Sequence, residues 1–382
     1  MRSVRFVDAI RPAALLVALT LTAACASSAS GEGDESPAAS GGPLKIGILA
    51  SLSGNLAEDG TAYVDAARAA IEAMENDVGR DVEISVYDER SETTEAVSGT
   101  RRLVDSARVD ILLSGLTSGN FLATRQVVDR ADIPVLTTAT APEVLEDNPG
   151  SIFRISQPLP DRIEDNVRFV VDELDARSVA FLQVNDEVQR VFADGAKELL
   201  DEDGVDVVSE QYFQYTDNDF SPYLSRLAQA DADVTFLGGE VTQCATILEQ
   251  ARAAGVETVF VLPTAASSSD FLESFGDVAE GTYVQTIYAP GTVASAEGRR
   301  FEDLAREHGF PLSYFSVVGY SEATIAMEAV ARAGSDGDVV EELAGGTFDT
   351  PLGRVEFDDD GQAVVDGIVA RIDGGRYVEV SE

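Results

Sequence analysis

The feature that most constrains this chain is a repeated alternation of short β-branched segments with longer segments of helical pattern. Residues 44–50 (LKIGILA) form a continuous apolar run of strand length, and residues 61–74 then repeat small and apolar side chains at helical spacing. The alternation continues to residues 152–156 and restarts at residues 179–184 (VAFLQV). Continuous apolar strands of this kind are typical of parallel sheets that helices cover on both faces. We therefore expect an α/β fold with parallel central sheets.

Two successive units of similar size make up this alternation. The other expected strands are residues 82–87, 111–113, 134–137, 205–208, 234–237 and 259–262, and the other expected helices are residues 94–107, 120–131, 188–200, 220–230 and 242–254. Two units predict two doubly wound domains, although a single barrel is an alternative because eight βα units also span about 250 residues. The tail disfavours the barrel, since its expected strands at 353–358 and 368–372 follow one another without a helix.

The N-terminus has the pattern of an export signal. Basic residues precede an apolar run at residues 13–24. This run is shorter than the roughly 20 residues that a helix needs to cross a ~30 Å hydrocarbon layer. Residues 1–24 are therefore predicted to be a signal peptide, and the mature chain is predicted to be extracytoplasmic.

The small residues immediately before Cys25 resemble the bacterial lipobox, in which the cysteine is acylated and becomes the mature N-terminus. Thr22 departs from that pattern, which prefers leucine, and ordinary cleavage at the alanine-rich site is the alternative. Residues 25–43 are rich in Ser, Gly and Ala, a composition typical of a flexible tether. We expect lipid attachment at Cys25 and a linker over residues 25–43.

The charge and the scarcity of reactive side chains exclude several functions. The net charge is −41, from 27 basic and 68 acidic residues, so binding to nucleic acid or anionic lipid headgroups is excluded because both rely on Lys and Arg. The one histidine, His308, rules out two-histidine zinc motifs, and neither Lys45 nor Lys197 follows a glycine as in a Walker loop. With Cys25 acylated, Cys244 has no disulfide partner. No catalytic residue, metal site or cofactor is predicted.

Several segments resemble one known family. These are residues 46–54 (IGILASLSG), residues 87–88 (YD), residues 138–143 (TATAPE) and residues 236–239 (FLGG). In this order they resemble the binding proteins of branched-chain amino acid ABC transporters, the type I periplasmic binding proteins, over residues 44–373. The resemblance implies that the chain is a solute-binding protein and not an enzyme.

The resemblance also implies a fold of two Rossmann-like lobes joined by a three-crossing hinge, which close on a ligand like a clamshell. Lobe 1 would hold residues 44–155 plus 287–367, and lobe 2 would hold residues 156–286 plus 368–382. The crossings would fall near Ser156, Thr286 and Val369. The tail would then return to complete both sheets.

Doubly wound sheets bind ligands beyond the carboxyl ends of their strands, and in lobe 1 those ends are rich in hydroxyl groups. Free backbone N–H groups at a helix N-terminus favour an anion, so these loops suit a carboxylate. The alternative is that Ser118 and Thr140 merely cap their own segments. The predicted ligand-binding residues of lobe 1 are Ser53, Thr117, Ser118, Gly119, Thr138, Ala139 and Thr140.

The lobe 2 residues depart from the family pattern. The resemblance places Val188 where a tyrosine is usual and Gln243 where an acid is usual, and Asp59 of lobe 1 stands where a tyrosine is common. A ligand ammonium needs carboxylate or carbonyl acceptors, which Asp59, Asp186 and Glu240 would offer. The alternative for each acid is a solvated surface position. The predicted ligand-binding residues of lobe 2 are Asp186, Val188, Glu240 and Gln243.

The sequence thus predicts the solute-binding lipoprotein of an ABC importer, which takes up a small carboxylate-bearing solute such as an amino acid, a related amide or an organic acid. Its expected partners are the solute and a transporter permease, with the membrane reached only through the lipid anchor. We expect a monomer. An extracellular sensing module of the same fold, which passes its signal to a separate membrane protein, is the alternative.

Overall fold

A computed structural model describes residues 5–6, 42–115, 117–335 and 337–380 of the chain. The predicted signal peptide, Cys25 and the linker lie outside these residues, except for strand β1 (Arg5–Phe6) and positions 42–43. Statements about the structure below concern the described residues.

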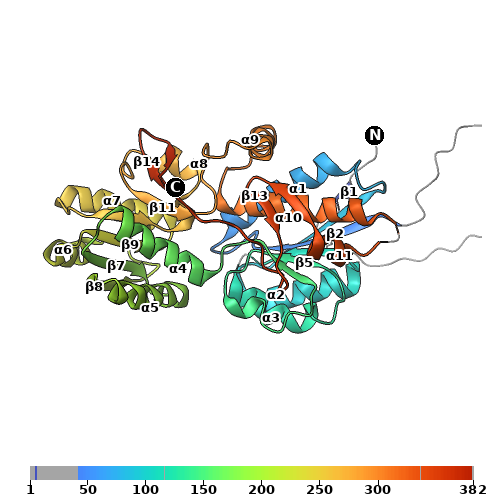
Figure 1. Cartoon of the computed structure of the whole chain (residues 1–382), viewed down its shortest axis with the longest axis horizontal. Helices are drawn as coiled ribbons and strands as arrows, with labels where there is room; N and C mark the ends of the chain where they lie inside the picture. Colours follow the sequence, from blue (N-terminus) through green and yellow to red (C-terminus); the bar gives the residue numbers. More distant parts are fainter. Residues whose placement is uncertain (1–4, 7–41, 116, 336, 381–382) are drawn as a thin grey trace, which may run out of the picture.

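Two separate open sheets organise the chain, and they lie toward opposite ends of its long axis (Figure 1). The first sheet has the order β1-β3-β2-β4-β5-β6, and every pair in it is parallel. Its strands are β1, β2 (Leu44–Ala50), β3 (Val82–Asp88), β4 (Ile111–Ser114), β5 (Val135–Thr137) and β6 (Ile152–Arg154). We call this sheet with its helices lobe 1. Two open sheets replace the alternative of one barrel, and the predicted α/β fold class is confirmed.

The second sheet, with its helices, forms lobe 2. Its order is β15-β14-β11-β10-β9-β7-β8, which is parallel from β11 to β8 and antiparallel where β14 and β15 join it. The strands are β7 (Ser178–Val184), β8 (Asp206–Phe213), β9 (Val234–Gly238), β10 (Val259–Leu262), β11 (Tyr283–Thr286), β14 (Ile368–Ile372) and β15 (Tyr377–Glu379). The residue boundaries predicted for the lobes remain a prediction.

Helices cover both sheets. In lobe 1 they are α1 (Ala57–Met74), α2 (Thr93–Arg101), α3 (Ser118–Val128), α9 (Ala296–His308), α10 (Tyr314–Ala333) and α11 (Val339–Gly345). In lobe 2 they are α4 (Leu159–Arg168), α5 (Glu187–Glu202), α6 (Ser221–Ala230), α7 (Val241–Ala254) and α8 (Ser269–Phe275). Short turns are the π-helices η1 (Arg102–Ala107) and η3 (Phe169–Glu173) and the 3₁₀ helices η2 (Pro142–Val144) and η4 (Thr264–Ala266).

The structure corrects the expected role of the tail. Strand β13 (Gly353–Glu356) pairs only with β12 (Thr347–Thr350), as a separate two-stranded hairpin. Beyond the hairpin, residues 361–363 run parallel to Arg154 of β6, whose N–H donates to the carbonyl oxygen of Gly361 at 2.8 Å and whose carbonyl oxygen accepts from the N–H of Ala363 at 2.9 Å. In lobe 2 the tail extends the sheet with the strands β14 and β15. In lobe 1 it adds only the short bridge of residues 361–363 to the edge strand β6, and the expected strand over residues 353–358 pairs within the hairpin instead. A hairpin closes its hydrogen bonds locally, and strand propensity alone does not say which partner a strand takes.

Helices α1 and α10 form the densest packing of lobe 1. The Cβ of an alanine at Gly319 would lie 2.4 Å from the backbone oxygen of Tyr63, so only glycine lets the two helices approach this closely. The Tyr63 hydroxyl donates a hydrogen bond to Oε2 of Glu322, whose side chain is fully buried. Oε1 of Glu322 has no hydrogen-bond partner among the described residues. Burial raises the pKa of Glu322 to about 8, so the native fold favours the protonated carboxyl group.

This buried carboxyl makes stability depend on pH. Because the native pKa lies above the unfolded value, the native state binds more protons between about pH 4.5 and pH 8, and the free energy of unfolding falls as pH rises through that window. We predict that Glu322→Gln raises the free energy of unfolding at pH 9 by about 3 to 5 kcal/mol and leaves it nearly unchanged at pH 5.

Urea denaturation at both pH values checks this prediction. The control is Glu307→Gln, at an exposed position on α9, which reports the effect of removing one negative charge from this acidic chain. Equal effects of Glu322→Gln at pH 5 and pH 9 would contradict it.

Candidate functional site

Three loops of lobe 1 meet at one edge of the first sheet. Strands β2, β4 and β5 are neighbours in that order and run parallel, so the loops that follow them lie side by side. These loops are residues 51–55, 117–120 and 138–141. The sheet thus brings together the strand ends that hold all the lobe 1 residues predicted to bind ligand.

Ser118 connects two of these loops. It is the first residue of α3, and its Oγ accepts hydrogen bonds from the backbone N–H of Thr140, at 3.1 Å, and of Ala141, at 3.0 Å. The helix is capped instead by Thr117, whose Oγ1 accepts from the N–H of Asn120 at 3.3 Å. The capping role considered for Ser118 therefore belongs to Thr117. Because both lone pairs of the Ser118 hydroxyl are used, its proton is available to a third group.

The loop after β5 is mostly buried. Thr138 is buried and its Oγ1 lies 3.3 Å from the hydroxyl of Tyr314, while Ala139 is buried and donates its N–H to Oγ1 of Thr137 at 3.2 Å. Thr140 is partly exposed, and its carbonyl oxygen accepts from the N–H of Leu159 on α4 at 3.2 Å. The loop therefore joins lobe 1 to the first helix of lobe 2.

Ser53 binds Asp88 and thereby stabilises its own loop. Its side chain is exposed, and its Oγ donates to Oδ2 of Asp88 at 2.7 Å while its N–H donates to Oδ1 of the same residue at 3.2 Å. Against the opposing effect of burial, hydrogen bonds from Ser53, Leu52 and the N–H of Arg90 hold the pKa of Asp88 below its usual value. The structure does not bring the Ser53 hydroxyl to the other two loops as a free donor. Gly119 lies in the first turn of α3, where an added Cβ would meet nothing within 4 Å.

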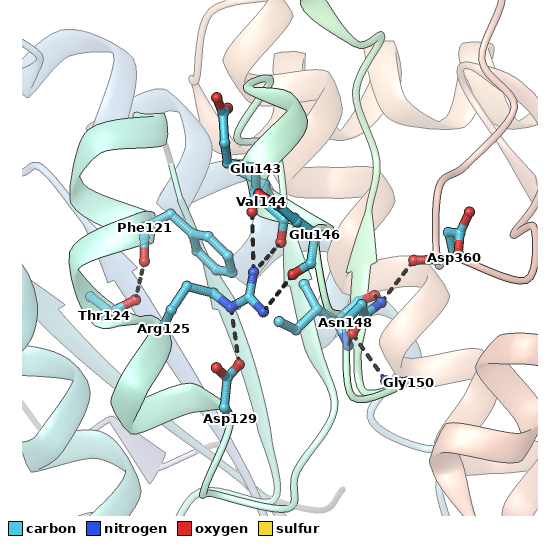
Figure 2. Close-up of polar contacts among 11 residues, drawn as sticks. Phe121, Thr124, Arg125, Asp129, Glu143, Val144, Glu146, Asn148, Gly150 and Asp360 are labelled. Carbon is cyan, nitrogen blue, oxygen red and sulfur yellow. Dashed lines mark hydrogen bonds and ion pairs between the residues drawn. The ribbon is translucent and has the colours of Figure 1, made fainter.

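Arg125 on α3 clamps the segment that follows the third loop (Figure 2). Its Nη1 donates to the carbonyl oxygens of Glu143, at 3.3 Å, and Val144, at 2.7 Å, and its Nη2 donates to that of Glu146 at 3.1 Å. Nε donates to Oδ1 of Asp129 at 3.0 Å, one turn further along the helix. One guanidinium thus satisfies three carbonyls of η2 and its neighbours and fixes their distance from α3.

Two of the predicted lobe 2 residues are occupied by structural bonds. Asp186 caps α5 by accepting from the N–H of Gln189 at 2.8 Å, and it also accepts from the Tyr215 hydroxyl at 2.7 Å. Nε2 of Gln243 donates to the carbonyl oxygens of residues 214, 215 and 217, at 3.1 to 3.2 Å. Gln243 therefore holds a loop in place. Val188 is 48% exposed and lines a pocket of lobe 2.

Glu240 faces acidic residues of lobe 1. Burial, and after it the negative charges of Glu240 and Glu58, raise the pKa of Asp59 to about 7. Burial and the charge of Glu58 likewise raise the pKa of Glu240. Such mutual effects require the three carboxyl groups to be near one another, across the two lobes. Asp59 and Glu240 thus influence one another's surroundings, while Asp186 bonds to the hydroxyl of Tyr215, whose pKa is raised by burial, by Asp186 and by the charge of Glu240.

The pocket of lobe 2 contains residues that the sequence patterns did not single out. Its polar lining is Arg162, Asn166, Gln183, Gln189, Thr264 and Gln285. We call it the lobe 2 pocket. A smaller pocket beside it shares Arg162, Thr264 and Gln285 and reaches Tyr314 of lobe 1. Helix α4, which carries Arg162, was not expected from the sequence, although Leu159, Ile163 and Val167 recur at helical spacing after Pro158 and could have revealed it.

A family model described as periplasmic binding protein matches residues 43–376. The chain belongs to the periplasmic binding protein family. The resemblance stated above is confirmed. This family is one of solute-binding proteins and not of enzymes.

Curated relatives of this periplasmic binding protein cover most of its length. The Leu/Ile/Val/Thr/Ala-binding protein of Pseudomonas aeruginosa is 24% identical over 325 residues, 83% of this chain and 86% of the relative. The Leu/Ile/Val-binding protein of Escherichia coli is 21% identical over 328 residues, 83% of this chain and 87% of the relative.

Solved structures show the same fold. The branched-chain amino acid transporter substrate-binding protein of Streptococcus pneumoniae, in complex with isoleucine, has a TM-score of 0.78 at 23% identity and covers 88% of this chain and 100% of its own. A solute-binding protein of an ABC transporter from R. palustris, in complex with benzoate, has a TM-score of 0.80 at 18% identity and covers 89% and 96%.

The described residues hold neither a candidate membrane span nor a candidate metal site. None of the helices there is both long and apolar enough to span a bilayer. Within the same residues, no group of three or more His, Cys, Asp or Glu side chains is placed to hold a metal ion.

The Arg125 clamp of this periplasmic binding protein should support both stability and ligand affinity. We predict that Arg125→Ala lowers the free energy of unfolding by about 1 to 3 kcal/mol, because three carbonyl oxygens lose a charged donor, and also weakens ligand binding by loosening the loop over residues 138–141. Urea denaturation and calorimetric titration measure the two effects. The control is Arg130→Ala, at an exposed position just after α3. A loss of stability no larger than that of the control would contradict the role of the clamp.

Proposed function

We propose that this periplasmic binding protein is the extracytoplasmic component of an ABC importer and binds a small carboxylate-bearing solute between its lobes. One observation supports a carboxylate ligand. The Ser118 hydroxyl oxygen accepts hydrogen bonds from two backbone N–H groups, so its own proton is free to be donated to a ligand. The first-turn N–H groups of Ser118 and Gly119 lie beyond the reach of intrahelical bonding, at the positive end of the helix dipole. Together these donors suit one carboxylate group without an Arg or Lys.

The acidic residues Asp59 and Glu240 suit an ammonium group of the ligand. Asp59 and Glu240 come from different lobes; after burial, the charge of Glu240 raises the pKa of Asp59, and the charge of Glu58 raises the pKa of both, so a cation beside these acids would relieve their repulsion. This favours an amino acid over an aromatic acid. The relatives named for leucine, isoleucine and valine agree with that ligand class, whereas the benzoate complex shows that the same fold also takes acids without an amine.

Closure about three crossings would bring the two halves of the site together. We place the crossings near Ser156, Thr286 and Val369, with lobe 1 at residues 44–155 plus 287–367 and lobe 2 at 156–286 plus 368–382. Buried amides line these crossings: Nε2 of Gln285 donates to Oε1 of Gln157 at 2.8 Å, and Nδ2 of Asn166 donates to Oε1 of Gln285 at 3.3 Å. A transporter permease would read the closed form.

The anchor completes the proposal. Acylation at Cys25 would hold the protein at the outer face of the cell membrane, and the tether over residues 25–43 would give it reach toward the permease. Mass spectrometry of the mature protein from its native host tests this, since a diacylglyceryl modification at Cys25 supports it and an unmodified N-terminus contradicts it.

The carboxylate site is tested by removing its hydroxyl donors. We predict that Ser118→Ala with Thr140→Val weakens binding of carboxylate ligands by about 10- to 100-fold, because the ligand loses a donor and two backbone N–H groups lose their acceptor. Calorimetric titration with a panel of amino acids, amides and aromatic acids measures it. The control is Ser98→Ala, whose exposed Oγ bonds only within α2, to the Thr94 carbonyl oxygen. Unchanged affinity would place the carboxylate elsewhere, and no binding of any compound to ligand-free protein would refute the proposed transport role.

The acidic cluster makes a prediction about pH. Asp59 changes from neutral to negative as pH rises through about 7, so an ammonium-bearing ligand should bind more tightly at pH 8 than at pH 6. A carboxylate without an amine, such as benzoate, should bind no better at pH 8. Asp59→Asn should remove the pH dependence seen with the amino acid. Titrations at the two pH values decide the matter, and a pH profile that survives Asp59→Asn would exclude Asp59 as the acceptor.

A further inference from the structure

Arg162 occupies the junction of the two pockets between the lobes. It lies in the first turns of α4, at the end of lobe 2 nearest lobe 1 (Figure 1), and lines both the lobe 2 pocket and the smaller pocket that reaches Tyr314. Its side chain is partly buried. A guanidinium in this position faces the space where a solute between the lobes would lie.

No carboxylate among the described residues pairs with Arg162. The acids of its own helix are engaged elsewhere: Glu164 pairs with Arg168, and Asp165 accepts from Nε2 of Gln157. The negative charge of Asp161 interacts with the guanidinium of Arg154 and favours its charged form. A cation held away from water without a counterion is costly, so the structure leaves this charge to be neutralised by something that enters the pocket.

A second residue of the same pocket also lacks a partner. Gln183 is 1% exposed, and its Oε1 has no hydrogen-bond partner among the described residues. The neighbouring amides are different, because Asn166, Gln285 and Gln157 bond to one another in a chain that ends on Asp165. Within the described residues, the donors of Arg162 and this buried acceptor of Gln183 are therefore left for a ligand. A buried acceptor without a partner calls for a donor on the ligand.

We infer that Arg162 binds a second acidic group of the solute, and that Gln183 accepts a hydrogen bond from it or from a group beside it. The inference rests on the proposed function, which assigns the first carboxylate to the loops of lobe 1. Arg162 approaches from the other lobe, across Tyr314, whose hydroxyl meets Thr138 of lobe 1 at 3.3 Å. The two sites thus take two groups of one molecule.

The class of solute follows from three positions in the site, one with neutral donors and two with charged side chains. Lobe 1 offers neutral donors for one carboxylate, Asp59 and Glu240 offer acceptors for an ammonium, and Arg162 offers a guanidinium for another oxyanion. An acidic amino acid carries all three groups. Its amide analogue keeps the shape but would leave the charge of Arg162 uncompensated.

Acid and amide pairs of matched shape test the inference. Ligand-free full-length protein is titrated calorimetrically with L-glutamate against L-glutamine, with L-aspartate against L-asparagine, and with terephthalate against benzoate. We expect the acid to bind at least ~30-fold more tightly than its amide or monoacid analogue in at least one pair. In Arg162→Gln this preference should fall to within about threefold, while the affinity for the neutral analogue stays within about threefold of wild type.

Matched variants separate recognition from folding. Arg168→Gln, on the same helix but outside the lobe 2 pocket, should keep the full preference for the acid. Arg162→Lys keeps the charge without the two-pronged geometry and should keep an intermediate preference. The melting temperature of unliganded Arg162→Gln should equal or exceed that of wild type, because an uncompensated charge is removed, and a large fall would assign Arg162 to the fold instead.

The outcomes are distinguishable. If carboxylates bind but no acid is preferred over its analogue, or if the preference survives Arg162→Gln, the second acidic group is wrong and the proposed function stands. If Arg162→Gln weakens acid and analogue equally, Arg162 binds the first carboxylate and the inference is overturned. If no carboxylate binds at all, the proposed function itself fails.

Discussion

The parallel pairing of the central strands is the constraint on which the rest of this structure depends. Apolar strands such as β2 are buried on both faces, so their backbone polar groups must be paired with neighbouring strands. Parallel pairing sends every carboxyl end to the same edge of the sheet. The loops that follow β2, β4 and β5 therefore lie side by side. The position of the hydrogen-bond donors of the site is thus a consequence of the strand pairing in the core.

A layer of hydrogen bonds behind those loops keeps them in position. Arg125 fixes the carbonyls of η2, Ser118 ties α3 to the loop after β5, and Asp88 holds Ser53 and Leu52. None of these groups needs to touch a solute to matter, because a binding site works only when the groups that do touch it are held rigidly. The hydroxyl groups of these loops thus have two roles: some hold the loops in position, and some are available to bind a ligand.

The large negative charge of the chain is unevenly arranged around the cleft. The donor loops over residues 117–120 and 138–141 contain no acid, while Asp59, Glu58 and Glu240 stand close enough to influence one another's ionisation. Against a net charge of −41, Arg162 is a cation at the cleft that no ion pair in the described part of the chain neutralises. Charges arranged in this way select the orientation of a zwitterionic solute more than they attract it.

Local pattern was sufficient to predict the α/β class, the strands of both sheets that lie in the regular alternation, and the family, because apolar periodicity and short loop motifs are properties of neighbouring residues. Partner choice was not predictable from the sequence. No local sequence pattern distinguishes β13, which pairs in a hairpin, from β14, which joins the second sheet. No local pattern shows either that the side-chain amide of Gln243 binds backbone carbonyls of a loop. The sequence by itself thus determined which segments become strands and helices. Only the tertiary structure decided that the Ser118 hydroxyl binds the loop after β5 and that Arg162 lacks an ion-pair partner in the described residues, because these contacts depend on groups brought together from distant parts of the chain.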